Sequence, residues 1–387
     1  MTSDATTKPH TKHEKMARPS LGTFARTELA ILGTPCGNIK KLAYELTQRL
    51  SEEATIAYVD ADHKGEDTIE TIPALSAGAS LVFTDKITFK RFDLNRPLND
   101  YQWKPLFNDY DLVLVNGNHF TASVQIAVID PKKPLEKKLD RLTNVQLLLL
   151  KDTDTVPDYL QTHLGEKLSG MPVYRFDETE KIADWVQQFL KQQTAPLLGL
   201  VLTGGKSTRM GRDKAVLDYH GKPQREYASD LLAKYCQDVF WSVNAEQATA
   251  LNGQSQLYIS DSFLGLGPLG GILSAFRQRP DAAWLVVACD LPLLSEKSLD
   301  ALVAGRNRSK MATAFLDSDN RFPEPLVSIW EPRAYPVLLQ FLAMGHSCPR
   351  KALINSDIAL LNAPDVQEFT NVNDPATLQV VSAQLRG

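Results

Sequence analysis

The chain has 387 residues, of which 43% are apolar and 23% are charged, and its formal net charge is −4. This length favours two or three domains with sizeable cores, and the balanced charge gives no indication of nucleic-acid binding. No apolar run approaches the roughly 18 residues that a membrane-spanning helix needs. The polar N-terminus lacks the apolar segment of a signal peptide, so residues 1–27 are expected to form a disordered tail.

The cysteines bear on the cellular compartment. They lie far apart in the sequence and lack CxxC spacing: Cys36, Cys236, Cys289 and Cys348. This pattern suggests neither a disulfide framework nor a zinc site. A cytoplasmic protein without membrane contact is the simplest expectation.

The first half alternates strand-like and helix-like segments between residues 28 and 192. Strands are expected at 28–34, 55–62, 80–85, 111–118, 124–130 and 145–151. Helices are expected at 38–50, 156–168 and 179–193, the first with its apolar residues on one face. Strands rich in Val, Leu and Ile and separated by helices are typical of a parallel, doubly wound α/β sheet.

The second half begins after a polar stretch at 192–196 that ends in proline, which predicts a domain boundary there. Further strands are expected at 197–203, 238–244, 256–260, 283–290 and 311–317. No internal repeat relates the halves. The sequence therefore predicts two different α/β domains with mainly parallel sheets, over residues 28–192 and 193–387.

Glycine and positive charge follow the first strand of the second half, in LTGGKSTRMGRDK at 202–214. Ligands of open α/β sheets bind beyond the carboxyl ends of the strands. Gly204 and Gly205 allow the backbone to approach a ligand closely, and Arg209 and Lys214 can bind phosphate oxygens. Two glycines alone favour an ordinary turn with solvated charges, but the whole spacing GGxSxRMGxDK is much more specific.

Two aspartates follow later strands. Asp290 ends the apolar run WLVVACD, where a carboxylate suits Mg²⁺, although a cap for the helix near Pro292 is an alternative. Asp261 precedes the glycine-rich GLGPLGG, which favours a ligand contact over a turn aspartate.

Two asparagines are also candidates. Asn244 ends the strand-like run DVFWSVN, and it could bind a ligand, cap the next helix or do both. Asn373 in NVNDP is a tentative metal ligand, with an Asx turn before Pro375 as the equally weighted alternative.

The stretch LTGGKSTRMGRDKAVLDYHGKP resembles the signature of the molybdenum cofactor guanylyltransferases, within the wider nucleotidyltransferase superfamily. The resemblance continues over 197–387 through SVNAEQ, ISDSFLGLGPLGGILSAF, VVACDLP and TNVNDPATL, with Thr203 where the family usually has alanine. It implies a Rossmann-like nucleotidyltransferase domain. It also implies transfer of GMP from GTP to molybdopterin, which yields the guanine dinucleotide cofactor and pyrophosphate.

The resemblance also implies roles for single residues. The glycine loop would line guanine and ribose, Lys214 and Arg209 would bind phosphates, and Asp290 would hold Mg²⁺, with Asn373 as a second metal-side residue. The implied nucleotide-binding residues are Leu202, Thr203, Gly204, Gly205, Lys214, Asn244, Asp261 and Asp290. Candidates for the pterin subsite are 346–353, with Arg350 and Lys351, and 321–325, although solvated surface charge is the simpler interpretation of both. Molybdopterin-insertion proteins or apo-molybdoenzymes are candidate partners.

Residues 28–192 resemble the molybdopterin-guanine dinucleotide biosynthesis adaptor, a P-loop GTP-binding protein, in the order of their features. A working P-loop needs GK followed by Ser or Thr, whereas this chain has Gly37-Asn38-Ile39. Asn116 stands where the family has a glutamate. We therefore expect a degenerate P-loop-NTPase-like domain that does not bind GTP tightly and that scaffolds, homodimerises or docks a partner.

Three alternatives to guanylyl transfer remain. Cytidylyltransferases tend to carry Ala-Gly at the position of Gly204-Gly205 and lack GPLGG. Sugar-1-phosphate nucleotidyltransferases have a longer segment after the position of Asp290. A non-catalytic regulatory or adaptor protein is the third, and the complete set of loop residues with Asp290 disfavours it for the second half only.

Overall fold

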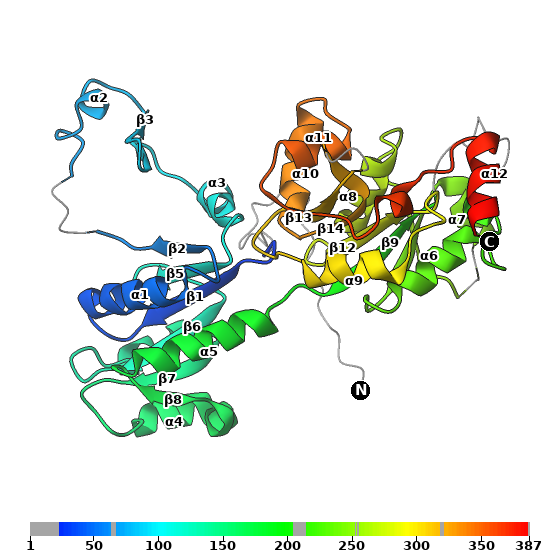
Figure 1. Ribbon diagram of the computed structural model, residues 1–387. Coiled ribbons are helices and arrows are strands. Elements are labelled where there is room, and N and C mark those ends of the chain that lie inside the picture. Colours follow the sequence, from blue (N-terminus) through cyan, green and yellow to red (C-terminus); the bar gives the residue numbers. More distant parts are fainter. Residues whose placement is uncertain are drawn as a thin grey trace, which may run out of the picture. The chain divides into compact units, whose positions relative to one another are not determined.

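The computed structural model describes residues 23–62, 67–203, 214–251, 253, 255–317 and 321–385 (Figure 1). The chain divides into two compact units, whose described parts are Asp62–Phe107 and, in the second unit, Thr23–Ala61 with the chain from Asn108 onward. The predicted tail falls mostly outside the described residues. Thr23 donates its backbone N–H and its hydroxyl to Asp281, which anchors the start of the second unit.

The second unit contains two sheets, and its first sheet has six parallel strands in the order β2-β5-β1-β6-β7-β8. These strands are β1 Thr27–Leu32, β2 Ile56–Val59, β5 Leu112–Asn116, β6 Val124–Ile129, β7 Val145–Leu150 and β8 Val173–Arg175. The helices are α1 Cys36–Leu50, α4 Asp158–Leu164 and α5 Thr179–Gln192. Short 3₁₀ helices lie at Glu136–Arg141 and Gly165–Gly170. The predicted segments from this half, apart from 80–85, therefore form this sheet and its helices.

Helices cover both faces of the first sheet, as the alternation of its side chains requires. Helices α1 and α5 pack side by side on one face, where Ile39, Leu46 and Ile182 are fully buried (Figure 1). Leu135 and Leu160 cover the opposite face.

The second sheet has seven strands in the order β11-β10-β9-β12-β14-β13-β15, and β14 alone runs antiparallel to its neighbours. The strands are β9 Leu197–Leu202, β10 Val239–Val243, β11 Tyr258–Ser260, β12 Ala283–Ala288, β13 Ala312–Leu316, β14 Pro323–Trp330 and β15 Ile358–Leu361. The helices are α6 Gln224–Leu232, α7 Ala245–Ala250, α8 Pro268–Gln278, α9 Glu296–Ala304, α10 Ala334–Ala343, α11 Pro349–Ile354 and α12 Pro375–Gln384. Short 3₁₀ helices lie at Lys214–Val216 and Val366–Phe369. The prediction of mainly parallel α/β sheets is confirmed.

Strand β14 was not predicted from the sequence, because Pro323 and Pro325 argue against a central strand. The structure accommodates them where the pairing of β13 with β14 is irregular, between Ala314 and Leu316. A residue without a backbone N–H is tolerated at such an irregularity. The segment 321–325, a candidate for the pterin subsite with solvated surface charge as the simpler interpretation, thus includes the start of a mostly buried strand.

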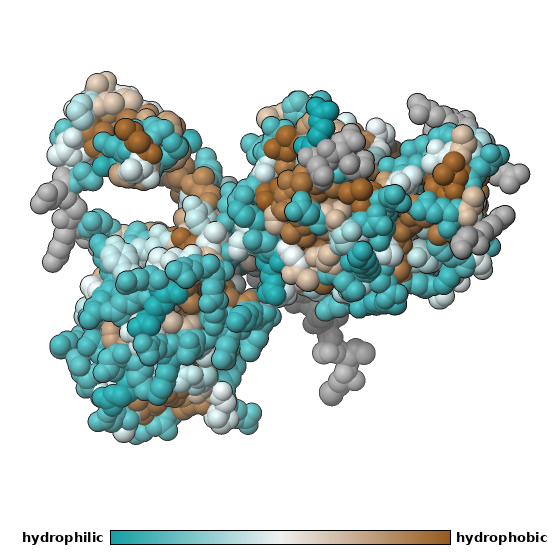
Figure 2. Space-filling view, viewed as in Figure 1, coloured by the Kyte–Doolittle hydropathy of each residue, from teal (hydrophilic) through white to brown (hydrophobic). Residues whose placement is uncertain are grey.

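The first unit is small. Its elements are α2 Pro73–Ser76, β3 Leu81–Asp85, β4 Lys90–Leu94, α3 Asp100–Trp103 and a 3₁₀ helix at Lys104–Phe107. The predicted strand 80–85 exists, but it pairs only with β4, antiparallel, and does not join the parallel sheet. The connection between the two strands is a short turn, whereas a parallel neighbour requires a crossover of a dozen residues or more. Figure 2 shows apolar side chains gathered over this hairpin. Phe83 and Phe92 belong to β3 and β4, are both exposed, and have ring centroids 5.0 Å apart.

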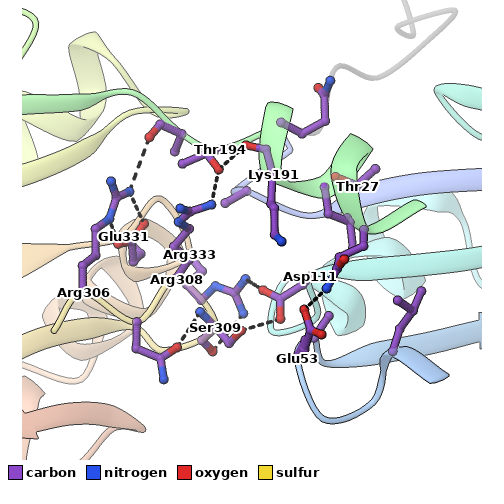
Figure 3. Close-up of a pocket in the computed structure, with 18 of the residues that line it drawn as sticks. Thr27, Glu53, Asp111, Lys191, Thr194, Arg306, Arg308, Ser309, Glu331 and Arg333 are labelled. Carbon is purple, nitrogen blue, oxygen red and sulfur yellow. Dashed lines mark hydrogen bonds and ion pairs between the residues drawn. The ribbon is translucent and has the colours of Figure 1, made fainter. Parts of the chain in front are cut away.

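The two sheets of the second unit meet through the amino ends of their strands. Asp111, just before β5, accepts hydrogen bonds from Arg333 at 2.5 Å and from the Ser309 hydroxyl at 2.6 Å (Figure 3). It also accepts from the Thr55 backbone at 2.8 Å. Burial alone would raise the pKa of Asp111, but Arg333 and these hydrogen bonds hold it below its ordinary value.

A cavity of about 480 Å³ lies at this junction. Its most buried ionic groups bond one another: Arg306 contacts Glu331 at 2.6 Å and Arg333 contacts Asp111. The Arg333–Asp111 pair joins one sheet to the other, whereas Arg306 and Glu331 both belong to the second half. The cavity lies at the amino edge of both sheets, away from the carboxyl edge where α/β proteins bind ligands.

None of the helices in the described ranges is long and apolar enough to cross a membrane.

The junction gives a stability prediction. Asp111→Ala leaves the buried Arg333 guanidinium without its carboxylate and should lower the free energy of unfolding by about 3 kcal/mol. As a control, Asp357→Ala breaks an ion pair with Lys310 whose carboxylate side chain is 76% exposed, which should cost about 0–1 kcal/mol. Urea denaturation of both variants measures the difference, and equal losses would contradict a structural role for the Asp111 contacts.

Candidate active site

The candidate residues of the second half lie at one edge of its sheet. Strands β11, β10, β9 and β12 are adjacent and parallel, so their carboxyl ends lie together. Leu202 ends β9, and Asn244, Asp261 and Asp290 follow β10, β11 and β12 within two residues. This edge is the place where open α/β sheets bind their ligands.

Lys214 brings two of the candidates into contact. Its ammonium nitrogen lies 3.7 Å from Asp290 Oδ2, and it also bonds Asn373 Oδ1. The side chains of Lys214 and Asp290 are only 19% and 20% exposed, so solvent screens this contact weakly. Three residues from distant parts of the chain therefore form one charged cluster, which we call the Lys214 cluster.

The Asp290 carboxylate is held in an environment that penalises its charge. Burial raises the pKa of Asp290, and the Lys214 ammonium opposes only part of the rise. Asp290 Oδ1 is buried and has no hydrogen-bond partner among the described residues. Buried carboxylate oxygens normally have a partner, so this atom is available to a ligand with positive charge.

The loop that holds Asn373 also contributes Asn371, which the sequence analysis did not single out. The Val372 N–H donates to the Asp290 backbone carbonyl at 2.9 Å and so fixes the loop beside the carboxylate. Asn371 Oδ1 is buried and, like Asp290 Oδ1, has no partner in the described part of the chain. The repeated asparagine in NVNDP is the signal that could have identified it.

These oxygens fit a divalent cation. Hard cations such as Mg²⁺ take carboxylate and amide oxygens together with water and phosphate oxygens, and they need few protein ligands. The described residues contain no group of three or more His, Cys, Asp and Glu side chains that could hold a metal alone. A cation at Asp290 would therefore rely on amide oxygens, substrate and water for its remaining ligands.

Asp261 is held beside the end of β9 through Ser242. The Ser242 hydroxyl donates to Asp261 Oδ1 at 2.8 Å, and the Ser242 carbonyl accepts from the Thr203 hydroxyl at 2.6 Å. Burial raises the pKa of Asp261, and the Ser242 hydrogen bond offsets part of that rise. Ser242, the first residue of SVNAEQ, thus positions a candidate that the sequence analysis identified.

At two positions of GLGPLGG, the surrounding atoms leave no room for a side chain. A Cβ at Gly271 would lie 2.5 Å from Ser242 Oγ, and one at Gly270 would lie 2.4 Å from the Phe263 carbonyl oxygen. Only glycine therefore lets the first turn of α8 approach the ends of β9 and β10. The motif packs this helix against the candidate edge.

Asn244 is the N-cap of α7. Its side chain accepts from the Gln247 N–H at 2.9 Å, and the Gln247 side chain accepts from the Asn244 N–H, forming a capping box. The capping alternative from the sequence is thus observed, and a ligand contact at Asn244 stays a prediction. Gly204, Gly205 and Arg209 lie outside the described residues.

The loop before α1 in the first half lacks the phosphate-binding lysine of a working P-loop, as its sequence indicates. Asn38 donates to the Thr34 hydroxyl at 2.8 Å, and Thr34 donates to Asp130 at 2.5 Å. Lys40 lies over the Tyr44 ring at 5.9 Å from its centroid. No lysine therefore takes the P-loop position in the described loop, and a P-loop-NTPase-like fold for this half stays a prediction.

Because the charge of Asp290 is buried, we expect this carboxylate to lower the stability of the free protein. Because folding raises its pKa, Asp290 lowers stability increasingly as pH rises above the unfolded value of about 3.9. In EDTA at about pH 8, Asp290→Asn should raise Tm by about 2 °C, and the gain should shrink as pH falls toward about 5. Differential scanning calorimetry across this range measures it.

Asp374→Asn is the matched control, because Asp374 caps α12 and its hydrogen bonds with Thr377 lower its pKa. Asn keeps the cap, so Tm should not rise. A Tm for Asp290→Asn below that of the unmodified protein at about pH 8 would show that burial does not penalise this carboxylate.

Known proteins similar to this chain include nucleotide transferases, which is consistent with a candidate site for a triphosphate at this edge. The family model of the MobA-like NTP transferase domain matches residues 199–359. A molybdenum cofactor biosynthesis bifunctional protein from Synechocystis sp. is 37% identical over 180 residues, which cover 46% of this chain and 52% of that protein. The chain thus matches about half the length of this relative. A molybdenum cofactor guanylyltransferase from Pseudomonas putida is 30% identical over 187 residues, which cover 46% of this chain and 94% of that protein.

Among solved structures, molybdopterin-guanine dinucleotide biosynthesis protein A from Archaeoglobus fulgidus aligns with 23% identity and a TM-score of 0.42, over 49% of this chain and 98% of that chain. The family model matches residues of the second half, where the candidate edge lies. Because one guanylyltransferase is matched over nearly its whole length, this chain belongs to the molybdenum cofactor guanylyltransferases, a family of nucleotidyltransferases.

Proposed function

We propose that the second half transfers GMP from GTP to molybdopterin, which produces the guanine dinucleotide form of the cofactor and pyrophosphate. The observation that carries the proposal is the Lys214 cluster at the carboxyl edge, where an ammonium group meets a carboxylate with an unpartnered buried oxygen. Such a pair suits a triphosphate and its cation. Family membership supports guanine as the base.

The nucleotide is proposed to lie across the ends of β9 and β10. Thr203 donates both its N–H and its hydroxyl to the Ser242 carbonyl, so the start of the glycine loop is fixed. Leu202 and the loop residues Gly204 and Gly205 would then contact guanine and ribose through their backbone. Asp261, next to Ser242, and Asn244 are the proposed side-chain contacts on this side.

Charge compensation is the main chemical task of these residues. The attacking phosphate oxygen of molybdopterin is already anionic, so the transfer needs no general base. Lys214 and Arg209 would offset the negative charge on the departing pyrophosphate, and the position of Lys214 beside Asp290 would help to orient the α-phosphorus for in-line attack. Such positioning and charge stabilisation account for most of the catalysis of phosphoryl transfer.

Magnesium is the proposed metal, because its preference for carboxylate and phosphate oxygens fits one buried aspartate. Asp290 Oδ1 is the proposed ligand, with Asn371 and Asn373 beside it. When bound, the metal supplies positive charge to the phosphate oxygens. The buried carboxylate then gains the counter-charge that it lacks in the free protein.

The pterin subsite is proposed at the same edge, near Arg350. The antiparallel register that pairs Val287 with Val327 places the start of β14 beyond the carboxyl end of β12. Arg350 bonds Glu324 there at 3.0 Å. The segments 321–325 and 346–353 thus adjoin one another, which supports a shared contribution to molybdopterin binding.

The first half is proposed to scaffold or dock rather than to turn over nucleotide. Homodimerisation, or contact with insertion proteins and apo-molybdoenzymes, fits a sheet without a phosphate-binding lysine in its loop. A cytoplasmic location is proposed because the four cysteines, all of which lie in the described part of the chain, form no disulfide.

Lys214→Ala tests the phosphate contact. Loss of one charge-assisted hydrogen bond costs about 1.5–3 kcal/mol, so GTP affinity should fall roughly ten- to a hundred-fold. Lys222→Ala is the matched control, because Lys222 follows in the same region but pairs with the exposed Asp230. Calorimetric titration with GTP and Mg²⁺ measures both. Unchanged affinity in Lys214→Ala would remove this residue from the triphosphate site.

A further inference from the structure

We propose that Cys36 is a nucleophilic thiol, activated by His119, that exchanges with negatively charged disulfides. The site lies at the carboxyl edge of the first sheet, in the loop where a P-loop protein would bind phosphate. Neither the family membership nor the proposed guanylyl transfer uses these residues. The inference is therefore independent of the proposed function.

A thiol and a base are in direct contact at this site. Cys36 Sγ lies 3.3 Å from His119 Nε2, and Asn118 Nδ2 lies 3.6 Å from the same sulfur. Asn118 also donates to the Thr34 carbonyl at 2.9 Å and is therefore fixed. Contact between a nucleophile and a base is the arrangement by which proteins activate a thiol.

A carboxylate lies close to the base. The charge of His119 is among the influences on Asp60, whose pKa burial alone would raise but which hydrogen bonds from Tyr58 and Asn116 hold below its ordinary value. Asp60 therefore stays ionised and can stabilise the imidazolium that forms when His119 takes the thiol proton.

The surroundings of the sulfur are electropositive. Cys36 is the first residue of α1, a helix of 15 residues with no acidic side chain in its first turn. Helix N-termini and neighbouring cations favour the thiolate, which is the reactive form. Lys133 lies close enough to Cys36 for the two groups to interact electrostatically. Arg141 donates to the carbonyl of Asn118, whose side chain contacts the sulfur. A disulfide with negative charge should bind there better than a neutral one.

The other three cysteines provide internal comparisons. Cys289 is buried, and burial raises the pKa of Cys236 to about 12, so neither should react in the folded protein. Cys348 is exposed, and no side-chain contact of its sulfur is found in the described part of the chain. If exposure alone determined the rate of reaction with a disulfide, Cys348 would react fastest. If His119 activates the thiol, the half-buried Cys36 should react faster than Cys348.

His119 takes the proton of the Cys36 thiol, and the thiolate attacks one sulfur of the disulfide. The new bond joins Sγ to that sulfur while the disulfide bond breaks, and the leaving thiolate departs free or takes the proton from His119. Cys36 is oxidised to a mixed disulfide, and half of the reagent is reduced.

The test uses the full chain and two probes, the dianionic disulfide 5,5′-dithiobis(2-nitrobenzoate) and the neutral 4,4′-dithiodipyridine. Quenched time points analysed by peptide mass spectrometry give a rate for each cysteine. Cys36 should react with the dianion at least about tenfold faster than Cys348, since a general base typically contributes a factor of about 10²–10⁴. His119→Gln should slow Cys36 at least tenfold and leave Cys348 unchanged.

Lys133→Met tests whether positive charge near Cys36 attracts the dianionic probe, apart from the activation of the thiol by His119. It should slow Cys36 more with the dianion than with the neutral probe, because it removes a cation that favours the thiolate and also the charge that attracts the dianion. Cys236 and Cys289 report on folding, because both would react in a variant that unfolds. A Cys36 rate no greater than that of Cys348, or one that folded His119→Gln leaves unchanged, would overturn the activated thiol. Equal slowing of both probes by Lys133→Met would overturn the preference for anionic disulfides.

Discussion

The site depends on one buried carboxylate at the end of a parallel strand. Burial raises the pKa of Asp290, and neither Lys214 nor a hydrogen bond fully compensates its charge. A group in this state costs the folded protein stability, and it is stabilised when a cation and a phosphate arrive. The NVNDP loop is fixed beside this carboxylate, because the Val372 N–H donates to the Asp290 carbonyl. The close packing of α8 holds it against Ser242, which bonds the proposed nucleotide contact Asp261.

In the second unit, the contacts that join the two sheets and the proposed ligand sites lie at opposite edges of the sheets. The two sheets meet through their amino ends, where Asp111, Arg333 and Ser309 form a mainly structural cluster. The carboxyl edges hold the sites proposed for chemistry, with the Lys214 cluster on one sheet and the Cys36–His119 pair on the other. Each edge keeps room for its own ligand because neither is used to join the sheets. This division lets a nucleotidyltransferase sheet accompany a second α/β sheet without blocking the nucleotide.

Much of this architecture follows from pattern alone. Apolar runs ending in Asp290, Asp261 or Asn244 predict both buried parallel strands and polar groups at one edge, because strand direction fixes where their carboxyl ends lie. Strand β14 escaped prediction because Pro323 and Pro325 are tolerated only through an irregular pairing that tertiary contacts determine. Asn371 and the Cys36–His119 contact escaped it as well. Burial of a single oxygen and a 3.3 Å approach across 83 residues depend on packing, which has no local signature.

The most direct measurement is a turnover assay with molybdopterin, Mg²⁺ and GTP, CTP or ATP in turn, in which pyrophosphate and the dinucleotide product are both quantified. With GTP, the full chain should release pyrophosphate only when molybdopterin is present. The amount of pyrophosphate should equal the amount of guanine dinucleotide product. Asp290→Ala should abolish this release while the variant keeps its circular dichroism spectrum. Comparable turnover with CTP, no turnover with any nucleotide, or full activity of folded Asp290→Ala would contradict guanylyl transfer at the Lys214 cluster.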